Sequence, residues 1–331
     1  MQRFINDPNQ VVDDMLQGYV KAHKTVKLSD ENHRVISLKE KVPGKVGVVS
    51  GGGSGHEPAF LGYVGKNMLD AVAVGEVFSS PTVSQFHQAI KEADNGAGVA
   101  VLFGNYAGDT MNVKMAIEEA EDDDIEVKYV LAKDDIASSP KENKEKRHGL
   151  AGGFFMWKVG GAKAASGGSL DDVIYSAQNV ADKTRSICVG LEPLIIPAVG
   201  KPNFIIEDGK MEFGIGHHGE AGIRKEKIKS ANEIAVEMTK AILEDFDFGE
   251  SKELAVMISG FGATPKMESY IIYNQVEKTL IEEGHSIWKT FIGDFATSLN
   301  MNGVSLTIVE LDDEIKELME LEAEPSGLET Y

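Results

Sequence analysis

The stretch Lys45-Val-Gly-Val-Val-Ser-Gly-Gly-Gly-Ser-Gly-His-Glu-Pro58 is typical of a buried strand that leads into a glycine-rich turn. We expect residues 45–50 to form the strand and residues 51–58 to form the loop. Four glycines in five positions allow backbone amides to approach a neighbour or a ligand closely. Loops at the carboxyl ends of strands are where α/β sheets place their sites, so this loop is a candidate site.

The same order of strand, loop and helix recurs further along the chain. Residues 70–74 and 98–103 are apolar strand patterns, and each leads into a loop and then a helical pattern. A fourth strand is expected over residues 125–131. Strands that alternate with helices predict an α/β fold with a mostly parallel sheet flanked by helices.

The second half of the chain predicts a mixed sheet. Asp208-Gly209 is a type I′ turn signal between two short apolar runs, so we expect a hairpin of residues 204–206 and 211–215. Elsewhere we expect an opening helix capped by Asp7, an exposed loop over 134–147, helices over 150–166, 170–183, 231–246 and 267–283, and strands over 186–190, 254–258, 287–292 and 304–311.

Length and composition limit the class of protein. The 331 residues suit two domains of about 150 residues each, and we expect an N-terminal α/β domain over 1–185 and a C-terminal α/β domain over 186–331. The formal charge of -20 disfavours direct binding to nucleic acid or to an anionic membrane. A single cysteine, Cys188, excludes an internal disulfide. The first ten residues have no apolar signal-peptide core, so a cytoplasmic protein is expected.

Two residues of the first half are candidates for chemistry. His56 lies at the mouth of the glycine-rich loop, which matches neither a Walker A loop nor a dinucleotide fingerprint. The alternative is a tight turn without a ligand. Asp109 closes the loop after the third strand, where it is either a helix N-cap, a functional acid, or both.

The stretch Gly216-His-His-Gly-Glu220 is the third candidate. Side chains alternate along a strand, so at most one of the two histidines faces a site and the pair is a poor metal clamp. With no other metal-ligand pattern in the chain, we expect no metal. The alternative is an exposed turn histidine.

Together these stretches resemble the dihydroxyacetone-binding (K) subunit family of dihydroxyacetone kinases. The resemblance covers essentially the whole chain and rests on motifs in the family's order: Ser50–Pro58, Gly75–Thr82, Asn105–Asp109, Met211–Glu220, Gly262–Pro265 and Thr297–Met301. It implies a homodimer of two-domain α/β subunits. It also implies that dihydroxyacetone binds covalently, as a hemiaminal to a histidine.

The resemblance assigns a role to each candidate. The covalent nucleophile would be His218 rather than His217, and Asp109 would accept a proton from a ligand hydroxyl as general base. His56 would hydrogen-bond the ligand, and Gly53 and Ser80 would line the pocket. Phosphate would come from a separate nucleotide-bearing subunit, so neither nucleotide nor metal is expected on this chain.

Departures from the kinase pattern change the expected function. Gly104 stands where the family usually has a lysine that could stabilise an incoming phosphoryl group, and Ala221 replaces a proline. We therefore expect the chain to be closer to a branch that binds dihydroxyacetone without phosphorylating it and acts as a coactivator on a TetR-like transcription factor of a kinase operon. The alternatives are the kinase subunit itself, with Asp109 as its base, and a simple triose carrier.

Overall fold

The computed structural model describes residues 2–249 and 253–327. The chain divides into two compact units, and each is built from more than one stretch of sequence. Unit 1 contains Met1–Ala132, Gly153–Ala181 and Asp313–Tyr331, and unit 2 contains Lys133–Gly152 and Asp182–Asp312. The sequence predicted two domains of contiguous sequence that meet between residues 185 and 186. This boundary stays a prediction.

Unit 1 is built on a six-stranded mixed sheet. Strands β5, β3, β6 and β7 are parallel neighbours, as predicted, and β2 and β1 extend the sheet antiparallel at the β5 edge. Sequence patterns missed these last two strands, which are short and lie in a polar stretch. The bounds are β1 Val26–Leu28, β2 Val35–Leu38, β3 Gly47–Ser54, β5 Ala71–Val77, β6 Val99–Gly104 and β7 Val127–Ala132.

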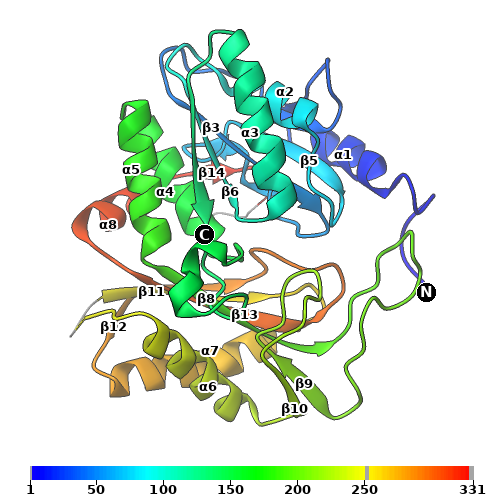
Figure 1. The fold of residues 1–331 in the computed structure, drawn as a ribbon, viewed down its shortest axis with the longest axis vertical. Helices are drawn as coiled ribbons and strands as arrows, with labels where there is room; N and C mark the ends of the chain where they lie inside the picture. The colour runs from blue at the N-terminus through cyan, green and yellow to red at the C-terminus, as the bar shows by residue number, and fades with distance from the viewer. Residues whose placement is uncertain (1, 250–252, 328–331) are drawn as a thin grey trace. The chain divides into compact units, whose positions relative to one another are not determined.

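Helices cover both faces of this sheet (Figure 1). Val99, Val101 and Phe103 of β6 pack in one core with helices α2 and α3, while the alternate residue Leu102 faces helix α4. A Cβ on Gly160 of α4 would lie 2.6 Å from the Leu102 Cδ1 atom, so this glycine allows close packing of helix on sheet. The helices are α1 Val11–Ala22, α2 Val83–Ala93, α3 Ala107–Asp122, α4 Gly153–Ala165, α5 Leu170–Asp182 and α8 Asp313–Glu320.

The first helix begins later than the sequence predicted. Gln10 is the N-cap of α1, and no side chain caps the helix, so the prediction that Asp7 is the N-cap is wrong. Asp7 instead forms a turn, in which its carboxylate accepts the backbone N–H of Asn9. Its backbone carbonyl accepts the N–H of Gln10.

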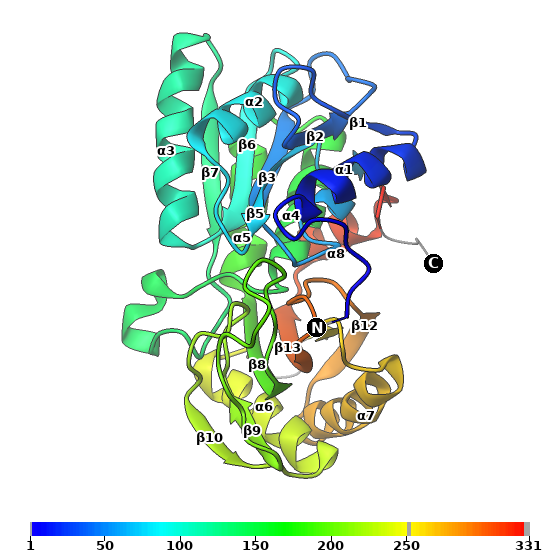
Figure 2. The ribbon, with the colours of Figure 1, turned by 90° about the vertical axis from the view of Figure 1, so that its right-hand side faces the viewer.

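Unit 2 contains a second six-stranded sheet, in the order β10-β9-β8-β13-β11-β12. Only β11 and β12 are parallel, so the prediction of a mixed sheet is confirmed. Helices α6 Ala231–Asp245 and α7 Lys266–Glu282 pack side by side on one face of it (Figure 2). The strands are β8 Thr184–Glu192, β9 Lys210–Phe213, β10 Arg224–Lys227, β11 Glu253–Gly260, β12 Ser286–Gly293 and β13 Asn302–Glu310.

The predicted hairpin around Asp208-Gly209 is wrong. Residues 204–206 form no strand, and β9 pairs instead with β10 through the connection at residues 214–223. Glycine permits the left-handed backbone conformation of Gly209 (φ 74°), but the turn there only introduces β9. The histidine pair therefore lies in the connection of a different hairpin.

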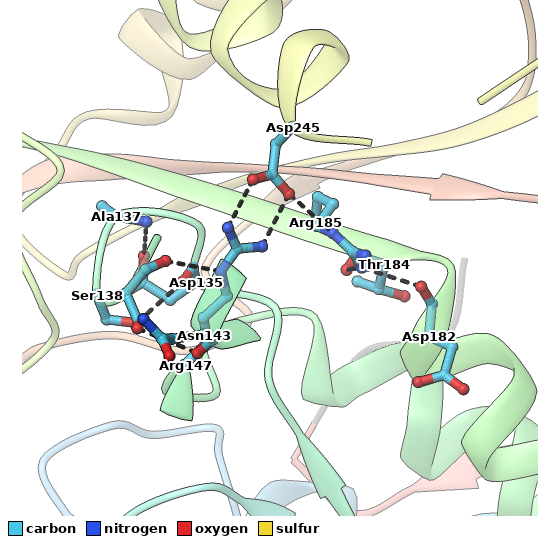
Figure 3. A network of polar contacts seen from close by, with 10 residues as sticks. Asp135, Ala137, Ser138, Asn143, Arg147, Asp182, Thr184, Arg185 and Asp245 are labelled. Atoms are coloured by element: carbon cyan, nitrogen blue, oxygen red, sulfur yellow. Dashed lines mark hydrogen bonds and ion pairs between the residues drawn. The ribbon is translucent and has the colours of Figure 1, made fainter. Parts of the chain in front are cut away.

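The segment 134–147 was predicted as an exposed loop, and its ends are buried instead. Arg147 is 1% exposed and donates two hydrogen bonds, of 2.8 and 2.6 Å, to the Asp245 carboxylate at the end of α6. Arg185 of β8 donates to the same carboxylate at 3.1 Å, as Figure 3 shows. The Arg147–Asp245–Arg185 network thereby ties this segment to the body of unit 2.

Candidate functional site

The glycine-rich stretch is part of a strand rather than a loop. Residues Gly51, Gly52 and Gly53 lie inside β3, which corrects the prediction that the strand ends at Ser50. A Cβ on Gly53 would lie 2.7 Å from the Ser79 nitrogen and 3.0 Å from the Phe78 Cα. Glycine is required here because the backbone that follows β5 passes directly over the strand.

His56 follows this strand and is buried, with 5% of its surface exposed. Its ring stacks on the ring of Phe78, with centroids 4.8 Å apart and an interplanar angle of 24°. The Phe60 ring meets it edge-on at 6.4 Å. Aromatic packing therefore holds the imidazole at the carboxyl end of β3.

Asp109, in the first turn of α3, and Ser80, in the loop that follows β5, are in direct contact. The Ser80 hydroxyl donates a 2.7 Å hydrogen bond to Asp109 Oδ2. Asp109 is buried in the first turn of α3, and Tyr106 is the N-cap, so the N-cap alternative for Asp109 is wrong. The amino end of a helix stabilises a negative charge, so this position favours an ionised Asp109 carboxylate. A Cβ on Gly108 would lie 2.6 Å from the Ser80 hydroxyl oxygen, so glycine at position 108 leaves room for the Ser80 side chain. Unit 1 thus brings Gly53, His56, Ser80 and Asp109 to the carboxyl ends of its parallel strands.

His218 lies in the connection between β9 and β10 of unit 2. Its Nδ1 atom is 2.8 Å from Glu220 Oε1, and its backbone N–H donates to Glu220 Oε2 at 2.8 Å. The backbone carbonyl of His218 accepts a 2.9 Å hydrogen bond from the Asn203 side-chain amide. One carboxylate therefore holds both the ring and the main chain of this histidine.

Glu220 is ionised in this arrangement. Burial alone would raise the pKa of this carboxyl, but the hydrogen bonds that it accepts from the His218 ring and from backbone N–H groups lower its pKa to about 2. Glu220 was not identified as a site residue from the sequence. Its position two residues after a histidine in a glycine-flanked turn is the signal that could have found it.

The neighbouring histidine has a different environment. His217 is 5% exposed, and its ring meets the Phe261 ring edge-on at 5.0 Å. Its backbone carbonyl accepts a hydrogen bond from the Ser298 hydroxyl. Burial lowers the pKa of His217 to about 3, so its ring stays neutral. We infer that His217 anchors the hairpin connection.

The charge of Glu220 in this connection acts on titratable groups of the segment 133–152. Asp135 is 2% exposed, and burial, together with the charges of Asp134 and Glu220, raises its pKa to about 7. Burial lowers the pKa of His148, although the charge of Glu220 opposes this shift. Among residues 2–249 and 253–327, no group of three His, Cys, Asp or Glu side chains is placed to hold a metal ion.

No helix in the described part of the chain is long and apolar enough to cross a membrane.

Comparison with known proteins places the chain in a family. A family model described as the Dak1 domain matches residues 17–326. A Listeria innocua protein, "PTS-dependent dihydroxyacetone kinase 1, dihydroxyacetone-binding subunit DhaK", is 43% identical over 314 residues, 95% of each chain. The dihydroxyacetone kinase of C. freundii, solved in complex with AMP-PNP and Mg²⁺, has a TM-score of 0.91 at 29% identity, covering 98% of this chain and 60% of that one.

The expectation that the chain stands closer to the coactivator branch is wrong. The "DhaKLM operon coactivator DhaQ" of Lactococcus lactis is 32% identical over 315 residues, which is 94% of this chain and 95% of that one. The Listeria kinase subunit is more similar, at 43%. The departures at Gly104 and Ala221 therefore do not outweigh the similarity over the whole chain. From the match over residues 17–326 and this identity, the chain belongs to the Dak1-domain family of dihydroxyacetone-binding DhaK subunits.

Proposed function

We propose that the chain is the dihydroxyacetone-binding subunit of a phosphotransferase-system-dependent dihydroxyacetone kinase. One observation carries the proposal: the chain is 43% identical to such a subunit along 95% of both chains. The fold agrees, with a TM-score of 0.91 to a dihydroxyacetone kinase. The expected coactivator role has weaker support, since the coactivator is the more distant relative.

The chemistry of each unit suits a part of this reaction. In unit 2, His218 is the proposed nucleophile that forms a hemiaminal with the ketone carbon, because a neutral imidazole nitrogen attacks small activated ketones near neutral pH. Only carbonyl compounds can form this adduct, so glycerol is rejected although it offers the same hydroxyl groups.

In unit 1, Asp109 is the proposed general base for the ligand hydroxyl that receives phosphate. The Ser80 hydroxyl bond orients its carboxylate. His56 is proposed to hydrogen-bond the ligand, and Gly53 to contribute backbone contacts. We further propose that the nucleotide is carried by a separate subunit, so that this chain supplies binding and proton transfer alone.

A coupled assay for dihydroxyacetone phosphate tests the proposal. It contains this chain, dihydroxyacetone, and the nucleotide-bearing and phosphocarrier subunits of the Listeria innocua system, with the authentic Listeria subunit as positive control. We expect product at a rate comparable to the control. No product, with the covalent adduct still visible by native mass spectrometry, would contradict the kinase function and favour a regulatory role.

The variant Asp109→Asn separates catalysis from binding. We expect turnover to fall at least about 100-fold, as for loss of a general base, while the adduct persists. Asp122→Asn, an exposed carboxylate at the other end of α3, is the matched control and should keep full turnover. Equal turnover of Asp109→Asn and the control would remove Asp109 from the mechanism.

A further inference from the structure

Two N–H groups of His218 converge on the single carboxylate of Glu220. The ring Nδ1 and the backbone nitrogen each lie 2.8 Å from a different oxygen of that carboxylate. An ionised carboxylate can only accept hydrogen bonds, so Nδ1 must carry the proton of the neutral ring. The lone pair then lies on Nε2, the ring atom away from Glu220.

The hairpin connection is built around this carboxylate. A Cβ on Gly216 would lie 2.9 Å from the Glu220 Cδ and 3.0 Å from its Cβ, so only glycine leaves room for the Glu220 side chain. The Gly216 N–H donates to the Glu220 carbonyl at 3.0 Å, and the Gly219 N–H donates to the Gly216 carbonyl at 3.0 Å. Gly219 adopts a left-handed conformation (φ 81°), which closes the turn. Main chain and side chain therefore fix the carboxylate before any ligand arrives.

We propose that Glu220 is a positioning residue that holds the His218 ring in the Nδ1–H form, directs Nε2 at the ketone, and balances the charge of the adduct. This inference rests on the proposed function and names the residue that sets up its covalent step.

Formation of the adduct moves two electron pairs. The Nε2 lone pair forms a bond to the ketone carbon, and the π pair of the carbonyl moves onto its oxygen. This oxygen takes a proton from a solvent water molecule, and the hydroxide that remains passes to the bulk solvent. The ring keeps its Nδ1 proton and becomes an imidazolium. The Glu220 carboxylate, already hydrogen-bonded to that proton, neutralises the new charge.

The chain offers a variant and a matched control. The two N–H groups of His218 meet different oxygens of the carboxylate, so in Glu220→Gln one of them would face the amide NH₂, which cannot accept its hydrogen bond. Glu212 of β9 is also a buried carboxylate, and it accepts the Gly222 N–H at 2.8 Å. Glu212→Gln keeps an acceptor for that bond, so it removes a charge from the same hairpin without releasing His218.

Two measurements test the proposal. Long-range ¹H–¹⁵N NMR of ¹⁵N-histidine-labelled protein reports which ring nitrogen of His218 is protonated, and titration with dihydroxyacetone under native mass spectrometry reports the adduct constant. We expect an Nδ1–H ring in the wild type and an imidazolium in its adduct. Glu220→Gln should give mixed tautomers and an adduct about 10- to 100-fold weaker, the value of a hydrogen bond to a charged group. Glu212→Gln should match the wild type.

Each other outcome is decisive. An Nε2–H ring in the wild type overturns the proposal, even if Glu220→Gln does not fold. A Glu220→Gln adduct as strong as the wild type, or an equal loss in Glu212→Gln, also overturns it. Absence of any adduct on wild-type His218 would instead contradict the proposed function.

Discussion

The candidate residues of the two units are held by different forces. In unit 1, His56 stacks on Phe78, and Gly53 of β3 lies directly against the backbone that follows the neighbouring strand β5. In unit 2, His218 is held by a carboxylate, and the segment beside it is fastened by the Arg147–Asp245–Arg185 network (Figure 3). The first arrangement depends on close packing. The second depends on charge, which is half-buried at His218 and Glu220 and buried in the Arg147–Asp245–Arg185 network.

This difference predicts different sensitivities. Close packing tolerates changes of pH but not added atoms, because a backbone neighbour cannot move aside. A site held by buried charges tolerates small changes of side-chain volume. It is destabilised when one member of an ion pair is removed or when a buried group changes its protonation state. The two tryptophans allow the units to be followed separately, since Trp157 lies in α4 of unit 1 and Trp288 in β12 of unit 2.

The largest effect is expected from Arg147→Ala. The substitution leaves the Asp245 carboxylate with Arg185 alone, and removal of one partner of a buried ion pair costs about 3–5 kcal/mol. We expect a loss near 3 kcal/mol, because Arg185 remains. Urea unfolding of a Trp157→Phe background, in which only Trp288 reports, should show the loss in unit 2.

Lys146→Ala is the control for this prediction, because Lys146 is the exposed neighbour in sequence. It should unfold as its parent does. An Arg147→Ala protein as stable as Lys146→Ala would mean that the network does not hold unit 2 together.

Gly53→Ala should have the next largest effect, in unit 1. The added methyl group would meet the Ser79 nitrogen and the Phe78 main chain, and overpacking of this kind costs about 1–3 kcal/mol. Unfolding followed by Trp157 in a Trp288→Phe background should report the loss. Gly18→Ala in α1 has open space around it and should stabilise unit 1 slightly, by about 0.5–1 kcal/mol. Equal effects of the two substitutions would contradict the packing argument.

The same contrast explains what the sequence could predict. The parallel strands of unit 1 and the placement of His56, Ser80 and Asp109 at their ends follow from a repeated apolar pattern and a general rule for α/β sheets. Even there, the glycines were assigned to a loop, because a strand of glycines has no apolar pattern to show that it continues.

Unit 2 was harder to predict because its contacts join residues far apart in sequence. Arg147 lies in a run of charged residues that is typical of an exposed loop, and only its partner Asp245 explains its burial. The hairpin of β9 and β10 was missed because the Asp208-Gly209 turn signal outweighed the polar pattern of β10. The resemblance supplied His218, but the role of Glu220 required the geometry of the turn.

The smallest effect is the change in the stability of unit 2 over a single pH unit. Burial raises the pKa of Asp135 to about 7, so the folded protein keeps this proton at a pH where the unfolded chain has lost it. Stability from this group is therefore complete below about pH 4 and is lost as the pH rises toward 7, by about 1 kcal/mol per pH unit. Asp135→Asn cannot ionise, and its amide oxygen can still accept the Ala137 N–H.

Between pH 5 and pH 6, the free energy of unfolding of the wild type, followed by Trp288, should fall by about 1 kcal/mol relative to this variant. The stability followed by Trp157 should not change between the two proteins. If the free energy of unfolding reported by Trp288 changed equally with pH in the wild type and in Asp135→Asn, Asp135 would be ionised throughout. The charge near Glu220 would then be solvated rather than buried.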